Sequence, residues 1–277
     1  MKKYHGAKVY DNKWYGYRAD RFDPRDFAFD PATTPGPLPD AVDLRADCPT
    51  PMDQGQLGSC TAHGIIGCAR YLLVKKGGPR DHRLSRLQLY YDERVIEGSV
   101  HDDSGAEIRD GIKALASIGV AHETLWPYTI SKFARLPPKS VYTDAAKFKG
   151  LRYERVDVNP ASIKAALATG FPVVVGFSVF ESFESDAVAG NGMVPMPDIN
   201  GEQMIGGHCV YVVGYGQHPG TFTCRNSWGT SWGDGGDFYM PEAYLGSTDF
   251  GGDYWRIPSV TGVTIGKTTF GDQTTGG

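Results

Sequence analysis

The sequence is poor in cysteine, in long apolar runs and in clustered positive charge. Five cysteines among 277 residues are too few for a disulfide scaffold of this size. No apolar run approaches the ~20 residues that cross a bilayer, so no membrane span is predicted. The net charge of −4, without a basic block, argues against a nucleic acid partner. No CxxC or HExxH spacing occurs, so neither a metal nor any other cofactor is expected.

What remains is the composition of a soluble globular protein, with 40% hydrophobic and 22% charged residues. The length allows one large domain or two lobes around a cleft. The basic start, Met1-Lys2-Lys3, is followed by Tyr4-His5-Gly6 instead of an apolar stretch. We therefore expect no signal peptide in this chain, which leaves both a secreted and a cytoplasmic location open.

Residues 60–76 have the pattern of a buried helix that begins at a cysteine. Apolar residues recur along it at helical spacing, and Gly77-Gly78-Pro79 predicts its end. Ser59 is a candidate N-cap. Cys60 falls in the first turn, where the positive end of the helix dipole favours a thiolate and lowers the thiol pKa. Cys68 lies two turns further along and is expected to pack in the core.

Residues 206–233 contain the pattern of a β-hairpin. The first strand runs from His208 to Gly216 and the second from Thr221 to Arg225, with a turn at 217–220 between them. Since the second strand ends at Asn226, the hairpin would bring Asn226 close to His208.

These residues together can carry out nucleophilic chemistry on an acyl group. His208 can take the proton of Cys60 and later protonate a leaving amine. Asn226 can orient the imidazole through its side-chain carbonyl. Gln54 can donate to the oxyanion beside the backbone N–H of Cys60. Trp228 can cover the contact between His208 and Asn226 and exclude water from it.

These motifs resemble those of the papain-like cysteine peptidases. Gln54 to Cys60 matches the family's spacing from glutamine to nucleophile, and residues 207–216 match its histidine segment. Residues 226–233 match its asparagine segment nearly residue for residue. The order of cysteine, histidine and asparagine and the gaps between them also agree. The resemblance covers about residues 38–258.

The resemblance implies an α+β papain-like fold of two lobes with a cleft between them. A helical lobe over about 38–125 would carry the helix that starts at Cys60. A β-barrel-like lobe over about 126–260 would carry His208 and Asn226, and 261–277 would be a flexible tail. The implied activity is that of a cysteine endopeptidase, which hydrolyses peptide bonds of a peptide or protein substrate through a thioester acyl-enzyme. We expect a monomer.

Three positions depart from the family pattern. Leu57 stands where the family has a disulfide cysteine, and Thr61 where an aromatic residue follows the nucleophile. Gly207 stands where Asp or Asn often precedes the histidine. These departures indicate a bacterial-type branch of the family rather than a lysosomal cathepsin. The disulfide state of the other cysteines stays open: Cys48, Cys68, Cys209 and Cys224.

Two further functions are compatible with the same residues. An acyltransferase or transamidase would use the same triad with an acceptor other than water. A non-catalytic binding homologue would keep the fold, although such proteins usually lose one of the groups that this chain retains. Within the site, His63 lies one turn from Cys60 and is an alternative base, but no orienting residue is evident for it.

The resemblance also implies substrate contacts. Ser104 and Gly105 lie in a loop whose backbone would pair with an extended peptide; the alternative is an ordinary turn between two helices. Gly207, Trp228 and Trp232 would line the cleft near the histidine. Residues 181–205, rich in glycine and proline, are predicted to form a long loop near the cleft.

Residues 1–37 form a polar arm with too many aromatic residues for a disordered tail. Two interpretations of this arm stay open. It is either an N-terminal extension that packs elsewhere or a segment that folds back and restricts the cleft, as a short propeptide would. The arm is shorter than the usual propeptide of the family and lacks its long helical pattern.

Overall fold

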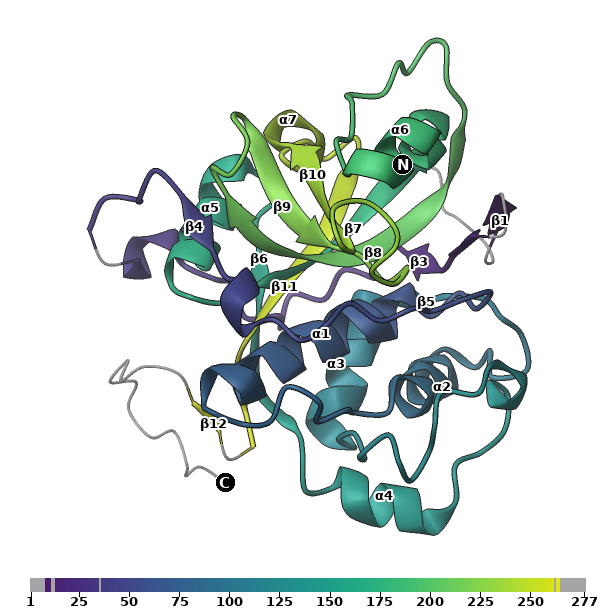
Figure 1. Ribbon diagram of the computed structural model, residues 1–277. Helices are drawn as coiled ribbons and strands as arrows, with labels where there is room; N and C mark the ends of the chain where they lie inside the picture. The colour runs from purple at the N-terminus through teal and green to yellow at the C-terminus, as the bar shows by residue number, and fades with distance from the viewer. Residues whose placement is uncertain (1–7, 11–12, 35, 262, 265–277) are drawn as a thin grey trace.

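The computed structural model describes residues 8–10, 13–34, 36–261 and 263–264. A twisted sheet and a group of helices face each other across the molecule, and the central helix α1 runs along their junction (Figure 1). The helices on one side are α1 (Cys60–Lys75), α2 (Arg86–Glu97), α3 (Ile108–Ser117) and α4 (Lys139–Ala145). Those that accompany the sheet are α5 (Pro160–Ala168), α6 (Asp186–Asn191) and α7 (Glu242–Leu245). The two-lobed α+β fold expected from the sequence is confirmed.

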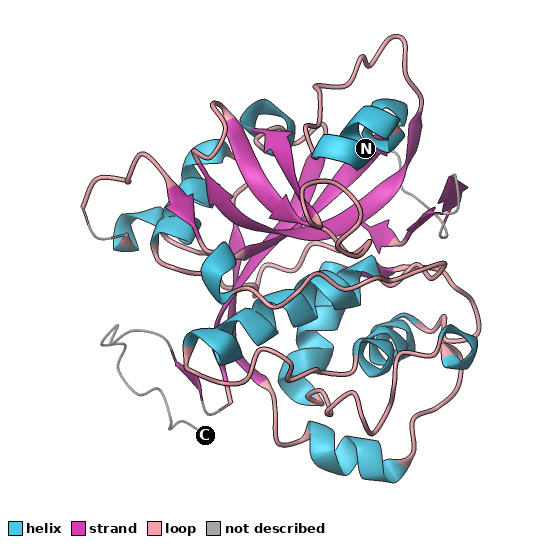
Figure 2. Ribbon diagram, in the orientation of Figure 1, coloured by secondary structure: helices cyan, strands magenta, loops and turns pink. Residues whose placement is uncertain are grey.

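An eight-stranded sheet forms the second lobe (Figure 2). Its main path runs β10-β9-β8-β7-β11-β12, while β4 pairs with β8 and β6 pairs with β11. The strands are β4 (Val42–Asp43), β6 (Gly150–Val156), β7 (Val173–Phe180), β8 (Met204–Tyr215), β9 (Thr221–Arg225), β10 (Asp237–Pro241), β11 (Gly251–Val260) and β12 (Val263–Thr264). The arm adds a hairpin of β1 (Lys8–Tyr10) and β2 (Lys13–Tyr15), and β3 (Tyr17–Arg18) pairs with β5 (Ala106–Glu107).

The core has two hydrophobic clusters, one on each face of the sheet. Strand β8 contributes to both because its side chains alternate in direction. Cys209, Tyr211 and Val213 belong to the cluster that contains the buried face of α1. Val210 and Val212 belong to the cluster on the opposite face. This double burial fixes the register of β8, since a slip of one residue would exchange the two sets.

The predicted boundaries of α1 and of the β8–β9 hairpin agree with the structure within a few residues, but residues 181–205 differ from the prediction. They hold a short 3₁₀ segment (Glu181–Glu184) and α6 in place of one long loop. Ser185 caps α6 through its hydroxyl, and Gly192 ends the helix in the left-handed conformation. Local capping signals therefore outweigh the glycine-rich composition here.

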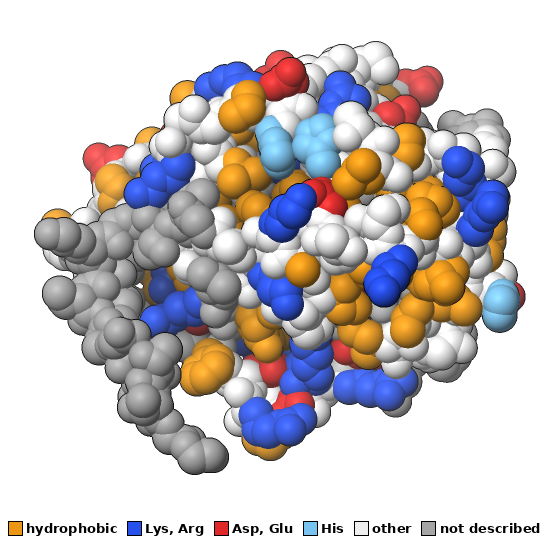
Figure 3. All heavy atoms as spheres, turned by 90° about the horizontal axis from the view of Figure 1, so that it is seen from below, with side chains coloured by type: hydrophobic (Ala, Val, Ile, Leu, Met, Phe, Trp, Pro, Cys, Tyr) orange, Lys and Arg blue, Asp and Glu red, His pale blue; other side chains and the backbone are white. Residues whose placement is uncertain are grey.

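All five cysteines lie in the described residues, and all are buried and free. Cys209 is in register with Gly176 and Cys224 with Val212, so the two thiols do not face each other across the hairpin. Among the described residues, no helix is long and apolar enough to cross a membrane, and no three His, Cys, Asp or Glu side chains gather as metal ligands would. On the helical side of the molecule, basic side chains lie scattered among hydrophobic and acidic ones (Figure 3).

Candidate active site

Cys60 is the first residue of α1 and is completely buried. Its sulfur accepts hydrogen bonds from the backbone N–H groups of Gly16 and Cys209. Burial raises the pKa of the Cys60 thiol to about 12, and the nearby Glu93 carboxyl acts in the same direction. The expected lowering of this pKa by the helix dipole is therefore not met, because desolvation outweighs the dipole while the sulfur is covered.

His208 and Asn226 meet as the hairpin predicts. His208 lies on β8, and its Nε2 donates to Oδ1 of Asn226 at 2.8 Å. The same Oδ1 accepts the backbone N–H of Ser227 at 2.8 Å, which fixes the orientation of the amide. The proton on Nε2 leaves the basic lone pair on Nδ1. Trp228 stacks on the imidazole with ring centroids 5.0 Å apart.

Gln54 is buried and tied to the asparagine segment. Its backbone N–H donates to the carbonyl of Ser227 at 2.8 Å, and its Oε1 accepts the Ser227 hydroxyl at 2.5 Å. Its Nε2 donates to the carbonyl of Leu57 at 2.9 Å. This bond fixes the orientation of the side-chain amide, whose NH2 group is a donor. The segment that leads to Cys60 is thus held against the segment that follows Asn226.

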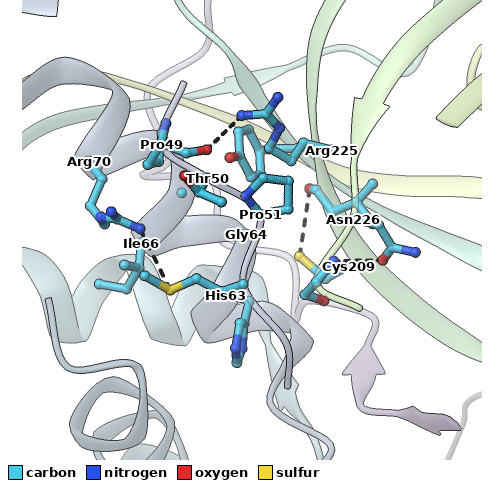
Figure 4. A pocket seen from close by; sticks show the side chains of 15 residues that line it. Pro49, Thr50, Pro51, His63, Gly64, Ile66, Arg70, Cys209, Arg225 and Asn226 are labelled. Atoms are coloured by element: carbon cyan, nitrogen blue, oxygen red, sulfur yellow. Dashed lines mark hydrogen bonds between the residues drawn. The ribbon is translucent and has the colours of Figure 1, made fainter. Parts of the chain in front are cut away.

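A small cavity of about 20 Å³ lies behind these residues, between α1 and the hairpin (Figure 4). His63 and Gly64 line it from α1, and Cys209 and Asn226 line it from the sheet side. This volume holds about one water molecule. The cavity is therefore too small to bind a peptide substrate.

The N-terminal arm runs across the nucleophile. Besides the bond from its N–H to the Cys60 sulfur, Gly16 accepts the N–H of Ala106 at 2.7 Å through its carbonyl. A Cβ on residue 16 would lie 1.8 Å from the carbonyl oxygen of Gly58, so only glycine fits at this depth. Tyr15 meets the His208 ring edge-on at 5.7 Å.

Acidic residues hold the outer part of the arm. The Asp20 carboxylate, fully buried, accepts the Trp255 indole N–H at 2.8 Å and lies 3.2 Å from a nitrogen of Arg155. Asp26 accepts Nε of Arg109 at 2.8 Å. Burial, with the charge of Asp253 next in size, raises the pKa of Asp20 to about 8. The arm is therefore fastened to both lobes, since Arg109 lies on α3 and Arg155 on β6.

The family model described as "Papain family cysteine protease" matches residues 38–248. The chain belongs to the papain family of cysteine proteases.

Individual relatives agree with this family. An "Uncharacterized peptidase C1-like protein" of Acanthamoeba polyphaga mimivirus is 42% identical over 76% of this chain and 70% of its own. Cathepsin K of Gallus gallus is 32% identical over 72% of this chain and 57% of its own. Among solved structures, xylellain, a cysteine protease from Xylella fastidiosa, is 36% identical, with a TM-score of 0.82 over 93% of this chain and 98% of that one. The chain spans less than two thirds of several of its curated relatives.

The departures from the papain pattern have structural consequences. Leu57 is buried in the core. Thr61 donates its hydroxyl to Glu93 at 2.8 Å, and burial raises the pKa of Glu93 well above its ordinary value. Gly207 lies against the arm, since a Cβ there would be 2.6 Å from the carbonyl oxygen of Tyr17. The small residue before the histidine thus makes room for the arm.

His63 has a structural environment rather than that of a base. Its Nδ1 lies 2.9 Å from the carbonyl oxygen of Ser59, and its Nε2 lies 2.9 Å from a guanidinium nitrogen of Arg86. Burial, then the charge of Arg86, holds the His63 pKa well below its usual range. Ser59 is the N-cap residue of α1 as predicted, but its hydroxyl contacts the Tyr128 hydroxyl at 2.6 Å and makes no side-chain capping bond. No sequence signal pointed to Arg86.

The predicted substrate contacts fall into two groups. Gly105 and Gly207 touch the arm: a Cβ on Gly105 would meet the Gly16 carbonyl oxygen at 2.1 Å. The Ser104 hydroxyl, in contrast, bonds to Ser99 at 2.9 Å within its own loop. Besides Trp228, which stacks on the imidazole, the indole of Trp232 meets Trp228 nearly at right angles, with centroids 4.9 Å apart, and supports it from behind.

Proposed function

We propose that the chain is a cysteine endopeptidase that uses Cys60 as nucleophile, His208 as base, Asn226 as orienting residue and Gln54 in the oxyanion hole. The bond between His208 Nε2 and Asn226 Oδ1 carries the proposal. It selects the tautomer that can accept a proton on Nδ1. The backbone N–H of Cys209, the residue after His208, bonds to the Cys60 sulfur, and this contact supports the pairing of nucleophile and base.

The proposed reaction has two acyl-transfer steps. Once the arm has left, His208 Nδ1 takes the thiol proton, and the resulting thiolate attacks the peptide carbonyl carbon. The side-chain amide of Gln54 and the backbone N–H of Cys60 donate to the oxyanion that forms. The N–H of Cys60 is one of the helix N–H groups without an intrahelical acceptor. Collapse expels the amine, which takes the proton from His208. A water, deprotonated by the same imidazole, then hydrolyses the thioester.

The second part of the proposal is that the arm keeps this site latent. At Gly16 the arm presents an N–H to the sulfur, and the neighbouring carbonyl is already bonded to Ala106. Tyr15 meets the imidazole edge-on and the buried sulfur has a raised pKa, so both reacting groups are blocked while the arm is in place.

Alkylation by iodoacetamide across pH, with peptide mapping of all five cysteines, tests the proposal. The experiment compares the unchanged chain with Gly16→Val, in which the arm cannot seat. We expect selective alkylation of Cys60 below pH 7 in the variant, because the uncovered thiolate pairs with the imidazolium, and slow alkylation in the unchanged chain. Labelling of the variant spread evenly over Cys60, Cys68 and Cys209 would refute the ion pair.

A further inference from the structure

A side-chain pocket next to the nucleophile is filled by Tyr17 of the arm. The residue follows Gly16 directly and is only 7% exposed. Its ring lies against Gly176 on β7, where a Cβ would come within 2.2 Å of the ring. Gly207 forms an adjoining wall, where a Cβ would lie 3.0 Å from the ring. Two glycines on neighbouring strands thus leave a slot with the depth of one aromatic ring.

The pocket ends in a carboxylate. Oδ2 of Asp253 accepts the Tyr17 hydroxyl at 2.7 Å, while Oδ1 accepts a guanidinium N–H of Arg155 at 3.0 Å. Asp253 is the one non-glycine residue with positive φ in the described chain, at 59°. It stands where the pairing of β11 with β7 shifts register, between Gly252 and Trp255. An irregularity of this kind re-aims a side chain, here into the slot.

We propose that Asp253 is a specificity-determining residue, which selects a tyrosine side chain of the substrate once the arm has left the cleft. The inference rests on the proposed function, because it assumes that the arm and the substrate use the same cleft. The Asp20 backbone N–H, which also donates to Oδ2 at 2.7 Å, departs with the arm. Oδ2 of Asp253 then faces the next occupant of the slot with no donor from the arm.

The charge around the carboxylate favours a phenol over a cation. Arg155 contacts three carboxylates in the covered state, from Asp20, Asp26 and Asp253. Two of these leave with the arm, so Arg155 and Asp253 remain as a pair without net charge. A lysine or arginine side chain would then be desolvated without a net negative partner, whereas a neutral hydroxyl needs only the acceptor.

The same acceptor discriminates against phenylalanine. A phenylalanine ring fills the slot but leaves Oδ2 of Asp253 without a donor, and a site built to bond a hydroxyl disfavours the analogue that lacks it. Since Asp253 is partly exposed, water offsets part of this cost. We expect kcat/KM to be roughly tenfold higher for tyrosine than for phenylalanine, which corresponds to about 1.4 kcal/mol.

The test uses the full chain carrying Gly16→Val and sets of fluorogenic peptides that differ at one position. Tyrosine, phenylalanine and arginine are compared in turn at each residue on the acyl side of the cleaved bond. At the position that enters the slot we expect tyrosine to lead, and Asp253→Asn to reduce the tyrosine-to-phenylalanine ratio to near one. Asparagine also tolerates the left-handed backbone conformation of residue 253. When its amide oxygen accepts from Arg155, its NH2 group faces the slot, so a donor replaces the acceptor that bonds the tyrosine hydroxyl.

The ratio is a robust readout, because both peptides meet the same fraction of uncovered enzyme and that fraction cancels. Asp249→Asn, an exposed carboxylate in the loop before β11, is the matched control and should leave the ratio unchanged. Equal cleavage of tyrosine and phenylalanine peptides at every position, or a preference for arginine, would overturn the inference.

Failure of the proposed function gives a different result. If Gly16→Val cuts none of the peptides, the peptidase proposal fails, and calorimetric binding of the same peptides to the Gly16→Val, Cys60→Ala protein decides the inference. Tighter binding of the tyrosine peptide that depends on Asp253 would then support the pocket. Equal binding of the tyrosine and phenylalanine peptides would reject it.

Discussion

Two segments cross the junction of the lobes and meet at Cys60, and they are held in opposite ways. The segment from Gln54 to Cys60 is fixed mainly by buried side-chain and backbone hydrogen bonds, such as those from Gln54 to Leu57 and from Ser227 to Gln54, and its one carboxylate partner from outside the segment, Asp103, accepts the backbone N–H of Gly58 at 3.0 Å without an ion pair to it. The arm from Tyr15 to Asp26 is held by one close-fitting glycine and by carboxylates that pair with arginines. Both segments reach the same sulfur.

The difference matches two opposite requirements. An oxyanion hole must keep its geometry through every turnover, so its supports should not titrate near neutral pH. A cover must come away, so supports that respond to protons and salt are suitable for it. His63 shows the first type, because burial holds its pKa well below the usual range and keeps it neutral. Asp20 shows the second, because its pKa is raised to about 8.

The largest expected effect comes from the tightest contact of the arm. In Gly16→Val the new Cβ would lie 1.8 Å from the Gly58 carbonyl oxygen, so the arm must lift from the cleft. We expect kcat/KM for a peptide to rise on the order of 100-fold, equivalent to about 2.7 kcal/mol, within the range typical of overpacking. Ala19→Val, at an exposed position of the same arm, is the control and should change little. Equal activity of the two variants would remove the arm as an inhibitor.

A roughly tenfold loss of activity is expected when a support of the segment from Gln54 to Cys60 is removed. In the Gly16→Val background, His63→Phe removes the donor to the Ser59 carbonyl and the acceptor for Arg86. The loop before Cys60 loosens, so kcat should fall roughly tenfold with little change in KM. The pH profile from 5 to 8 should stay the same, because the pKa of His63 lies well below that window.

This variant also separates the two candidate bases. If His63 took the thiol proton, its loss would cost the 10²–10⁴-fold typical of general-base catalysis and one limb of the pH profile. His101→Phe, an exposed histidine, serves as the control. A loss as large as that of His208→Ala would reverse the assignment of the base.

The pH dependence of the arm should give a smaller, several-fold effect. The pKa of Asp20 is about 8 when the arm is docked and returns to an ordinary value of about 3.9 when it is free. Docking therefore takes up a proton, and the contribution of Asp20 is complete below about pH 4 and is lost as pH rises through about 8. Arm release should become easier from pH 5.5 to 8.5.

The activity of the unchanged chain is divided by that of Gly16→Val at each pH. This ratio isolates the release of the arm, because the pH dependence of catalysis by Cys60 and His208 is common to both proteins and cancels. The ratio should rise with pH. Asp20→Asn keeps an acceptor for Trp255 but cannot titrate, so its ratio should be flat. A ratio that falls with pH would mean that Asp20 does not control the arm, since burial first and the charge of Asp253 second oppose the ionisation of Asp20 in the docked arm.

The fixed segment was largely predictable from the sequence, whereas the placement of the arm was not. The start of α1 at Cys60 and the approach of His208 to Asn226 follow from helical periodicity and from a single hairpin, which are local signals. The arm depends on Ala106, Gly207 and Asp253, which lie far from it in sequence. Aromatic content predicted that the arm packs, but no local pattern gives its partners.

The same distinction between local sequence signals and contacts with distant residues explains why the predicted lowering of the Cys60 pKa is wrong. The helix dipole that favours a thiolate can be predicted from the first turn of α1. The burial that overrides it is supplied in part by Gly16, whose backbone covers the sulfur. Asp253 had no signal at all, because a left-handed aspartate at a register shift looks in the sequence like an ordinary residue of a β-strand.

The smallest effect is expected where the arm's ion pairs reach solvent, and two neighbouring carboxylates make the comparison. The two carboxylates are almost equally buried, with side chains 10% and 7% exposed, but one partner of Asp23 is the exposed Arg25, whereas Asp26 bridges Arg109 and Arg155. Exposed pairs contribute little because water and salt screen them. Asp23→Asn should therefore raise the basal activity less than about twofold. Asp26→Asn leaves a buried guanidinium short of a partner and should raise it several-fold. If Asp23→Asn released the arm as strongly as Gly16→Val, the arm would be held by its surface charges, and the close fit at Gly16 would not be what keeps Cys60 covered.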